Sequence, residues 1–459
     1  MFACLLGMTA WGCSTSEIAG DGASAADSGV RTDAGSLPDA HGLSTDAPAD
    51  ASELVPRYTT DLTYSPLTKA IARRLRAIAA LNQDLLHDDV FMKAGDSITV
   101  ATQFMTCFAG SNVKLGQNSD LASDIAFFKA GDANGSSPFD RASVAAKIGW
   151  SADGVLAAAG LQPDPSVSWL NTEFGNVFPR YALVMFGTND VYSRSIVMFE
   201  SSMMTIVDDL VGQGVIPILS SVPPNDGTTP DAIAANLRVP TFNAVVRAIA
   251  QARQLPFMDF WKELEPLPLH GLGPDGVHPN TALSGPCDLT SAGLQYGFNV
   301  RNLLSMRSLA RVHAVVAGGT PPDPEPSMPA VTGEGSYDKP FVISGFPFSD
   351  LRDTSMSSNT RFTRYSGCMA SQDESGPEYV YRLALSAQTT VHAYVFARGP
   401  VDIDLHLLSG LDVADCLKRA DKDFTATLAP GTYYFVLDTF VPADGTPRSG
   451  EYLFLLLTE

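Results

Sequence analysis

The sequence has few basic residues, few histidines and no long apolar run, and each scarcity excludes a class of function. Lys and Arg number 30 against 50 Asp and Glu, which leaves a formal net charge of −20 over 459 residues. An acidic chain without a Lys/Arg-rich run repels nucleic acid and anionic lipid, so we expect neither as a partner. The seven histidines stand in no HExxH or CxxC context. We therefore assign no metal site and no cofactor.

The GxSxG motif, which places the nucleophile of α/β-hydrolases on a sharp turn, is also missing. The nearest segment, Gly149 to Asp153, reads GWSAD and lacks the second glycine. The sequence thus excludes that fold. With 45% hydrophobic and 17% charged residues the chain can still bury a core. Its length suits two or three domains of roughly 150 residues each.

The first 13 residues form a short apolar stretch that ends in small residues and a cysteine. The stretch is too short to span a membrane and suits the apolar part of an export signal. Gly12-Cys13 is similar to the end of a bacterial lipoprotein signal. We therefore expect lipidation of Cys13 and export to the cell surface, the periplasm or the medium, with membrane contact only through this anchor. The alternative is a mildly apolar tail without such a role.

Residues 14–56 consist mostly of Ala, Asp, Ser, Gly and Pro, with few large apolar residues. Such a segment cannot bury enough apolar surface to offset the entropy lost on ordering. We expect a disordered linker between the signal and the first folded domain.

Between residues 57 and 317, short apolar runs alternate with amphipathic patterns. The strand-like runs are 90–94, 181–186, 215–220 and 256–260, and the helical patterns are 67–85, 194–211 and 237–253. Alternation of this kind predicts a mostly parallel α/β sheet, whose ligands bind at the carboxyl ends of the strands.

A proline-rich linker is expected at residues 318–334, and the pattern beyond it changes to short strands without helices. The strand-like runs are 379–385, 390–397, 401–408, 432–439 and 452–457. They predict a smaller β-sandwich at residues 335–459. This region resembles the pre-peptidase C-terminal type of secreted domain in its VDIDLHLL run and its APGTYYFVLDT segment. The resemblance implies an accessory to a secreted enzyme rather than a catalytic domain.

Three polar side chains of the VDIDLHLL run, Asp402, Asp404 and His406, alternate and so share one face of the predicted strand. A Ca²⁺ site is one interpretation. Strand patterning favours a solvated polar face instead.

Four short motifs in the α/β region carry residue types that a serine hydrolase needs. Ser97 stands in GDS directly after the strand-like VFMKA, and Gly149 opens GWSAD after the strand-like SVAAK. Asn189 stands in GTND after the run YALVMF, and DGVH places Asp275 three residues before His278. A carboxylate at that spacing can hold the imidazole in one tautomer.

These blocks resemble, in order and strand context, the Ser, Gly, Asn and His blocks of the SGNH (GDSL) hydrolases over residues 60–310. The resemblance implies a flavodoxin-like, three-layer α/β domain and a carboxylic ester hydrolase. Carried over, Ser97 attacks the ester carbonyl, His278 takes its proton and Asp275 orients His278. The backbone N–H groups of Ser97 and Gly149 and the Asn189 side chain would form the oxyanion hole.

The GWSAD segment is also similar to the corresponding segment of rhamnogalacturonan acetylesterases, and no apolar lid is evident. Short acyl esters, particularly acetyl groups on polysaccharide, are therefore the favoured substrate. A lipase or lysophospholipase of the same superfamily stays open, as does a surface glycan-binding protein with an inactive hydrolase fold. The oligomeric state has no signature in the sequence.

Two of the six cysteines lie in the first 13 residues, and the other four fall two to each expected domain. One pair per exported domain suits disulfides in an oxidising compartment. We expect Cys107–Cys287 and Cys368–Cys416, with free buried thiols as the alternative.

Overall fold

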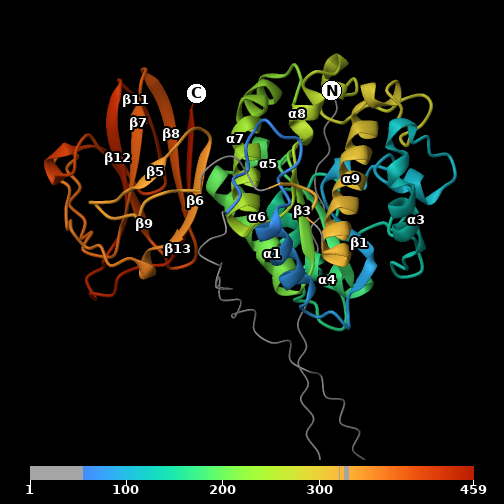
Figure 1. The fold of residues 1–459 in the computed structure, drawn as a ribbon, viewed down its shortest axis with the longest axis horizontal. Coiled ribbons are helices and arrows are strands. Elements are labelled where there is room, and N and C mark those ends of the chain that lie inside the picture. The colour runs from blue at the N-terminus through green and yellow to red at the C-terminus, as the bar shows by residue number, and fades with distance from the viewer. Residues whose placement is uncertain (1–54, 320, 325–329, 459) are drawn as a thin grey trace, which may run out of the picture. The chain divides into compact units, whose positions relative to one another are not determined.

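The structure is a computed structural model that describes residues 55–319, 321–324 and 330–458 (Figure 1). The expected export signal with Cys13, and all but the last two residues of the expected linker at 14–56, lie outside these ranges. The described residues belong to one compact unit, which contains an α/β part and a β-sandwich. None of the helices described is both long and apolar enough to cross a membrane.

A parallel sheet forms the centre of the α/β part, with the strand order β1-β2-β3-β4. Its strands are β1 (His87–Gly95), β2 (Pro179–Met185), β3 (Ile216–Ser220) and β4 (Phe257–Met258). Strands β2 and β3 are buried along their whole length. Continuous apolar runs are what a sheet covered on both faces requires.

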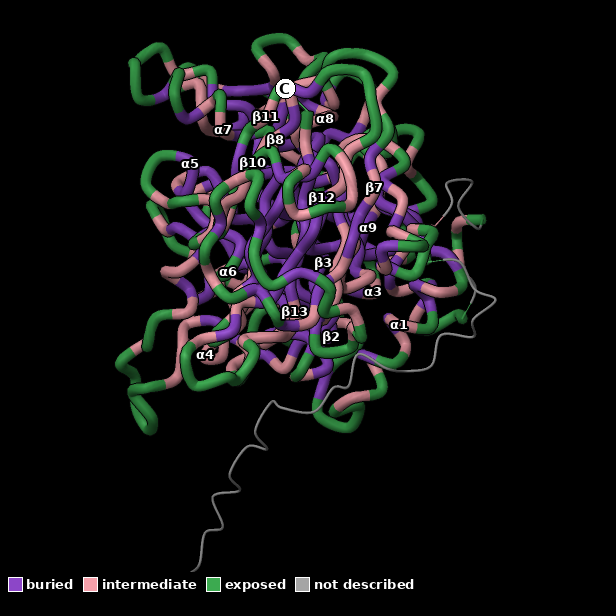
Figure 2. Tube along the Cα trace, turned by 90° about the vertical axis from the view of Figure 1, so that its left-hand side faces the viewer, coloured by how far each residue is buried: buried purple, intermediate pink, exposed green. Residues whose placement is uncertain are grey.

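Helices surround this sheet (Figure 1). The longer ones are α1 (Lys69–Ala79), α3 (Ala122–Ala130), α4 (Trp169–Val177), α6 (Ile196–Gly212), α7 (Pro230–Arg253) and α9 (Gly297–Gly318). Their apolar faces join the strands in one hydrophobic core. In Figure 2 the buried segments run through the interior, and the exposed ones form the loops around it. The predicted α/β class with a parallel sheet is confirmed.

Several boundaries differ from the sequence patterns for local reasons. Helix α7 begins at Pro230 rather than near residue 237, because Thr229 caps it by accepting a hydrogen bond from the Ala232 N–H and proline suits a first turn. The last strand is shorter than expected, because Asp259 caps a new helix, α8 (Phe260–Leu264). The expected strand at 143–147 is wrong, since only a single bridge joins Ala146 to Gly95.

The predicted β-sandwich is also confirmed. One sheet has the order β10-β9-β12-β7-β5 and the other has the order β11-β8-β13-β6. The strands are β5 (Phe341–Ile343), β6 (Phe348–Asp353), β7 (Tyr379–Leu385), β8 (Thr389–Ala397), β9 (Ile403–Leu408), β10 (Cys416–Ala420), β11 (Asp423–Leu428), β12 (Gly431–Thr439) and β13 (Glu451–Thr458). A second hydrophobic core lies between the sheets.

The expectation of a solvated polar face on β9 is wrong for two of its three residues. Asp404 and His406 are both buried. The His406 ring stacks on Tyr365 with 3.7 Å between ring centroids, and Asp404 accepts a hydrogen bond from Arg419 at 3.0 Å. Because Tyr365 of the preceding segment, 359–378, packs on His406, this part of the face meets protein instead of water.

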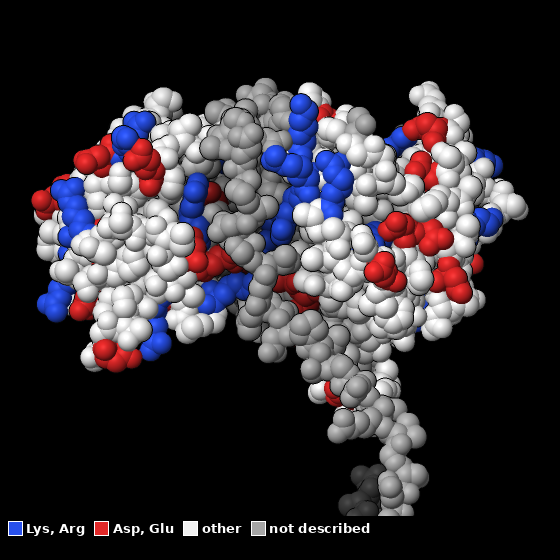
Figure 3. Space-filling model, turned by 60° about the horizontal axis from the view of Figure 1, so that its bottom comes forward, with Lys and Arg blue, Asp and Glu red and all other residues white. Residues whose placement is uncertain are grey.

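The sandwich and the α/β part share apolar and ionic contacts. Tyr394, Phe396, Leu453 and Leu455 of the β8–β13 sheet are members of the α/β core. Arg253 of α7 donates to Glu451 of β13 at 2.7 and 2.9 Å. Lys and Arg side chains lie among Asp and Glu side chains on the face shown in Figure 3. The sandwich is thus packed against the α/β part, and ion pairs reinforce the contact.

Candidate active site

Ser97 begins a one-turn helix, α2 (Ser97–Val100), immediately after β1. Asp96 caps this turn and accepts a hydrogen bond from the Ile98 N–H at 3.0 Å. At Gly95 a side chain is impossible, because a Cβ would lie 2.2 Å from Thr99 Oγ1 and 2.6 Å from the Met185 carbonyl oxygen. The tight strand-to-helix turn therefore places the Ser97 hydroxyl at the carboxyl edge of the sheet.

A continuous hydrogen-bond chain joins Ser97, His278 and Asp275. Ser97 Oγ lies 2.8 Å from His278 Nε2, and His278 Nδ1 lies 2.6 Å from Asp275 Oδ2. The other carboxylate oxygen of Asp275 accepts the N–H groups of Val277 and His278, each at 3.0 Å. These distances fit a nucleophile, a base and an orienting acid.

The environment of Asp275 keeps it ionised. Partial burial raises the pKa of this carboxyl, but the hydrogen bonds from Val277 and His278 outweigh it and hold the pKa below its ordinary value. An ionised Asp275 requires a proton on His278 Nδ1, which leaves Nε2 free to accept the proton of Ser97.

The segment that begins at Gly149 lies beside the turn after β2. Asn189 Nδ2 donates to the Trp150 carbonyl at 2.9 Å, and both carboxylate oxygens of Asp190 accept the Ala152 N–H, at 3.0 and 3.2 Å. Gly149 has φ +79°, and no atom lies within 4 Å of where its Cβ would stand. An amide has two N–H groups, so Asn189 retains one donor beyond the bond to Trp150.

Burial sets the protonation of Asp190. Burial raises the pKa of this carboxyl to about 7, while the hydrogen bond from Ala152 opposes the rise and the nearby Asp96 adds to it. The contact between the two predicted oxyanion segments therefore depends on a carboxyl that titrates near neutral pH.

A buried arginine, Arg301, contacts the turn after Ser97. The sequence analysis did not identify this residue. Arg301 of α9 donates to the Ile98 carbonyl at 2.6 Å and to Thr99 Oγ1 at 2.9 Å. Its guanidinium lies 3.6 Å from the centroid of the Phe104 ring. Burial lowers the pKa of Arg301 to about 9, and the Asp96 carboxylate opposes this. The available signal was an arginine among the apolar residues Val300 and Leu304 that α9 buries.

Both expected disulfides are formed. Cys107 pairs with Cys287, and Cys368 pairs with Cys416. The first joins the segment after the nucleophile to the segment after His278. The stretch between residues 108 and 140, which is rich in Gly, Ser, Asn and Asp, contains helix α3, whose Ile125 and Phe128 enter the core.

Two of the predicted catalytic residues, Asp275 and His278, lie at an open surface. The side chains of Asp275 and His278 are 53% and 43% exposed. A cavity of about 920 Å³, lined by Arg57, Tyr64, Arg311 and other residues, includes neither Ser97 nor His278.

Residues 94–283 match the model of the GDSL-like lipase/acylhydrolase family, a range that contains all five predicted catalytic and oxyanion residues. No curated protein sequence matches the chain. Among solved structures, the chain is similar to a GDSL-like lipase from Bacteroides thetaiotaomicron VPI-5482, with 15% identity over 53% of this chain and 98% of that one, and a TM-score of 0.32.

Two further solved structures are similar to different shares of the chain. One is a catalytic mutant of an acetylxylan esterase from Geobacillus stearothermophilus, with 16% identity over 48% of this chain and 93% of that one, and a TM-score of 0.30. The other is the pre-peptidase C-terminal domain of a collagenase from Bacillus anthracis, with 12% identity over 25% of this chain and 91% of that one, and a TM-score of 0.17.

Proposed function

We propose that this chain, a carboxylic ester hydrolase of the GDSL type, removes short acyl groups, acetyl above all, from polysaccharide through an acyl-enzyme on Ser97. The observation that carries the proposal is the hydrogen-bond chain from Ser97 through His278 to Asp275. A protein that only binds glycans has no need of an aligned nucleophile, base and orienting acid.

The reaction follows from the positions of these groups. His278 Nε2 accepts the hydroxyl proton while Ser97 Oγ attacks the ester carbonyl, and the imidazolium is stabilised by Asp275. The negative oxygen of the tetrahedral intermediate receives hydrogen bonds from the N–H groups of Ser97 and Gly149 and from the Asn189 amide. Each such donor contributes roughly 3–4 kcal/mol to the transition state.

Collapse of the intermediate breaks the bond to the alcohol, which leaves with the proton from His278. Water then enters, gives a proton to the same imidazole and attacks the acyl-enzyme. The acid departs, and His278 returns its proton to Ser97 Oγ.

The open setting of the catalytic pair supports a small acyl group on a bulky alcohol. Because His278 and Asp275 stand at the surface, a polymer can bring its acetyl group to Ser97 without entering an enclosed cavity. A lipase-type activity is the second candidate, and one observation favours it. Ile148, next to Gly149, is 71% exposed and offers an apolar contact for a longer acyl chain.

Export is part of the proposal. Two disulfides suit an extracellular or periplasmic enzyme. Lipidation of Cys13 stays a prediction that follows from the sequence alone.

A series of p-nitrophenyl esters with acetate, butyrate and octanoate tests the proposal. We expect activity to fall from acetate to octanoate and to vanish in Ser97→Ala. A rise with chain length would replace the polysaccharide esterase with a lipase. Equal inertness of the wild type and the variant would contradict the catalytic assignment.

A further inference from the structure

The loop that carries Asp275 and His278 is a short hairpin, residues 271–280, which we call the catalytic hairpin. Two backbone hydrogen bonds close it, from the Gly273 N–H to the His278 carbonyl at 2.7 Å and from the Asn280 N–H to the Gly271 carbonyl at 2.8 Å. Within the hairpin the position of the imidazole is defined. Its position relative to Ser97 depends on what holds the hairpin to the rest of the domain.

Asp226 contacts the tip of the catalytic hairpin and the residue that precedes the hairpin. Its backbone N–H donates to the Gly276 carbonyl at 2.8 Å, next to Asp275 at the tip. Its carboxylate lies 2.6 Å from Nδ1 of His270, the residue directly before the catalytic hairpin. Gly276 has φ +68°, and a Cβ there would lie 2.7 Å from the Asp226 carbonyl carbon. The two backbones therefore touch, and only glycine permits it.

The residues at the start of the catalytic hairpin adopt an unfavourable backbone conformation. Leu269, His270 and Gly271 have φ of 51°, 46° and 63°, so three successive residues are left-handed. That conformation costs a non-glycine residue roughly 1–2 kcal/mol. Leu269 is 79% exposed, so burial of its side chain does not hold the segment. Backbone hydrogen bonds from the His270 N–H to Leu267 and from the Leu272 N–H to Leu269 close the segment locally, and the pair between His270 and Asp226 joins it to the loop after β3.

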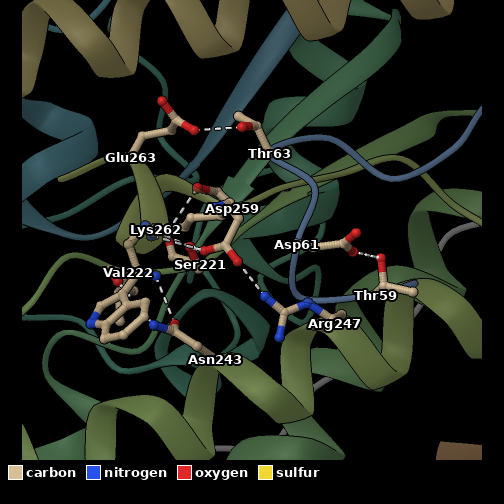
Figure 4. A network of polar contacts seen from close by, with 12 residues as sticks. Thr59, Asp61, Thr63, Ser221, Val222, Asn243, Arg247, Asp259, Lys262 and Glu263 are labelled. Carbon is tan, nitrogen blue, oxygen red and sulfur yellow. Dashed lines mark hydrogen bonds and ion pairs between the residues drawn. The ribbon is translucent and has the colours of Figure 1, made fainter. Parts of the chain in front are cut away.

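The loop after β3, residues 221–227, is anchored at its first two residues, Ser221 and Val222, by polar contacts with α7 and with Asp259 (Figure 4). Asn243 of α7 accepts the Val222 N–H at 2.8 Å and donates to its carbonyl at 3.1 Å. Ser221 donates to Asp259 at 3.0 Å, and Arg247 donates to the other oxygen of the same carboxylate. All these groups are buried.

We propose that His270 and Asp226 form a positioning pair, which holds the catalytic hairpin against the loop after β3 and so sets the distance from His278 to Ser97. The inference rests on the proposed function, because it assigns the pair an effect on catalysis through Asp275 and His278. Neither residue acts on the substrate. The pair fixes the hairpin, and the hairpin fixes the base.

Steady-state kinetics with p-nitrophenyl acetate on the full chain test the pair in His270→Gln, Asp226→Asn and the double variant. Asp226→Asn keeps the backbone bond to Gly276 and removes only the charged partner of His270. We expect kcat to fall about tenfold to a hundredfold in each, because a small misplacement of a reacting group has effects of this size. KM should stay within about twofold, since the substrate contacts are intact. The kcat of the double variant should be no lower than that of the less active single variant, because either substitution already breaks the pair.

A matched control separates positioning from general loss of stability. His392 of β8 pairs with Asp423 of β11 at 2.9 Å, and this pair is partly exposed, like the first. His392→Gln removes a similar pair far along the chain from the hairpin, and we expect it to leave kcat at the wild-type value. Proton NMR of the His278 Nδ1–H, identified by its absence in His278→Ala, should show a shifted or broadened signal in His270→Gln and an unchanged one in His392→Gln.

The outcomes distinguish a failure of the proposed function from a failure of the positioning pair. An inert wild type would contradict the proposed function itself. An active wild type with unchanged kcat in His270→Gln and Asp226→Asn would overturn the positioning pair alone. Equal losses in His270→Gln and His392→Gln, in proportion to their melting temperatures, would also overturn it.

Discussion

Arg301 donates a hydrogen bond to the backbone carbonyl of Ile98 at 2.6 Å, one residue after the nucleophile. A fully buried guanidinium thus supports the turn that presents Ser97, and it faces the buried carboxylate of Asp96. The nucleophile is held from two elements, because β1 brings it to the sheet edge and α9 fixes the turn after it.

Removal of this cation should destabilise the fold strongly. In Arg301→Met, the Ile98 carbonyl and Thr99 Oγ1 lose a buried donor, and leaving a buried polar group unsatisfied costs about 1–3 kcal/mol. Arg301→Lys keeps the charge and should lose less. Urea unfolding measures both variants, and a methionine variant as stable as the wild type would contradict this role of Arg301.

The Asn189 side chain should contribute to the chemical step more than to binding. Asn189→Ala removes an amide donor from the predicted oxyanion hole, and loss of one such donor lowers kcat about 10²- to 10³-fold. KM should change little, because the donor meets charge that develops only in the transition state. Initial rates with p-nitrophenyl acetate test this, and a change confined to KM would argue against the assignment.

Asp190 should make stability depend on pH. Its folded pKa of about 7 lies above its ordinary value. Between about pH 4 and 7 the folded state therefore holds a proton that the unfolded chain has already released. The free energy of unfolding therefore falls as pH rises through this window. In Asp190→Asn that fall should be smaller, which denaturation at pH 5 and pH 8 will show. Parallel pH profiles would refute the raised pKa.

The Cys107–Cys287 disulfide should contribute to stability. It closes a segment of 180 residues, and loss of a native disulfide typically costs about 2–5 kcal/mol. Cys107→Ser with Cys287→Ser should lower the free energy of unfolding by this order, measured with guanidinium chloride under non-reducing conditions. The Cys368→Ser and Cys416→Ser pair, in the sandwich, serves for comparison, and a first pair without effect would contradict the expectation.

The sequence motifs indicated the contact between Ser97 and His278 more readily than the loops around it. Ser97 and Asn189 stand in short motifs that follow the neighbouring parallel strands β1 and β2, and the tight hairpin of His278 brings its imidazole to Ser97. The supporting residues have no such signature. Arg301 comes from a helix near the end of the α/β part, and Asp226 meets His270 across 44 residues.

The burial of polar residues was the feature that the sequence pattern predicted least well. Alternation along residues 401–408 indicates two faces, but which of them meets water depends on the segment 359–378, whose Tyr365 packs on His406. Likewise, the glycine- and serine-rich composition of residues 108–140 gives little indication of helix α3. Its Ile125 and Phe128 are buried in the core, so tertiary packing rather than local sequence preference stabilises this helix.

The most direct test of the central claim is covalent labelling of the nucleophile with diisopropyl fluorophosphate, followed by peptide mass spectrometry. We expect one adduct, on Ser97, and its loss in His278→Ala, because the imidazole 2.8 Å away activates the hydroxyl. An adduct on another serine, or labelling of Ser97 that is unchanged without His278, would contradict it.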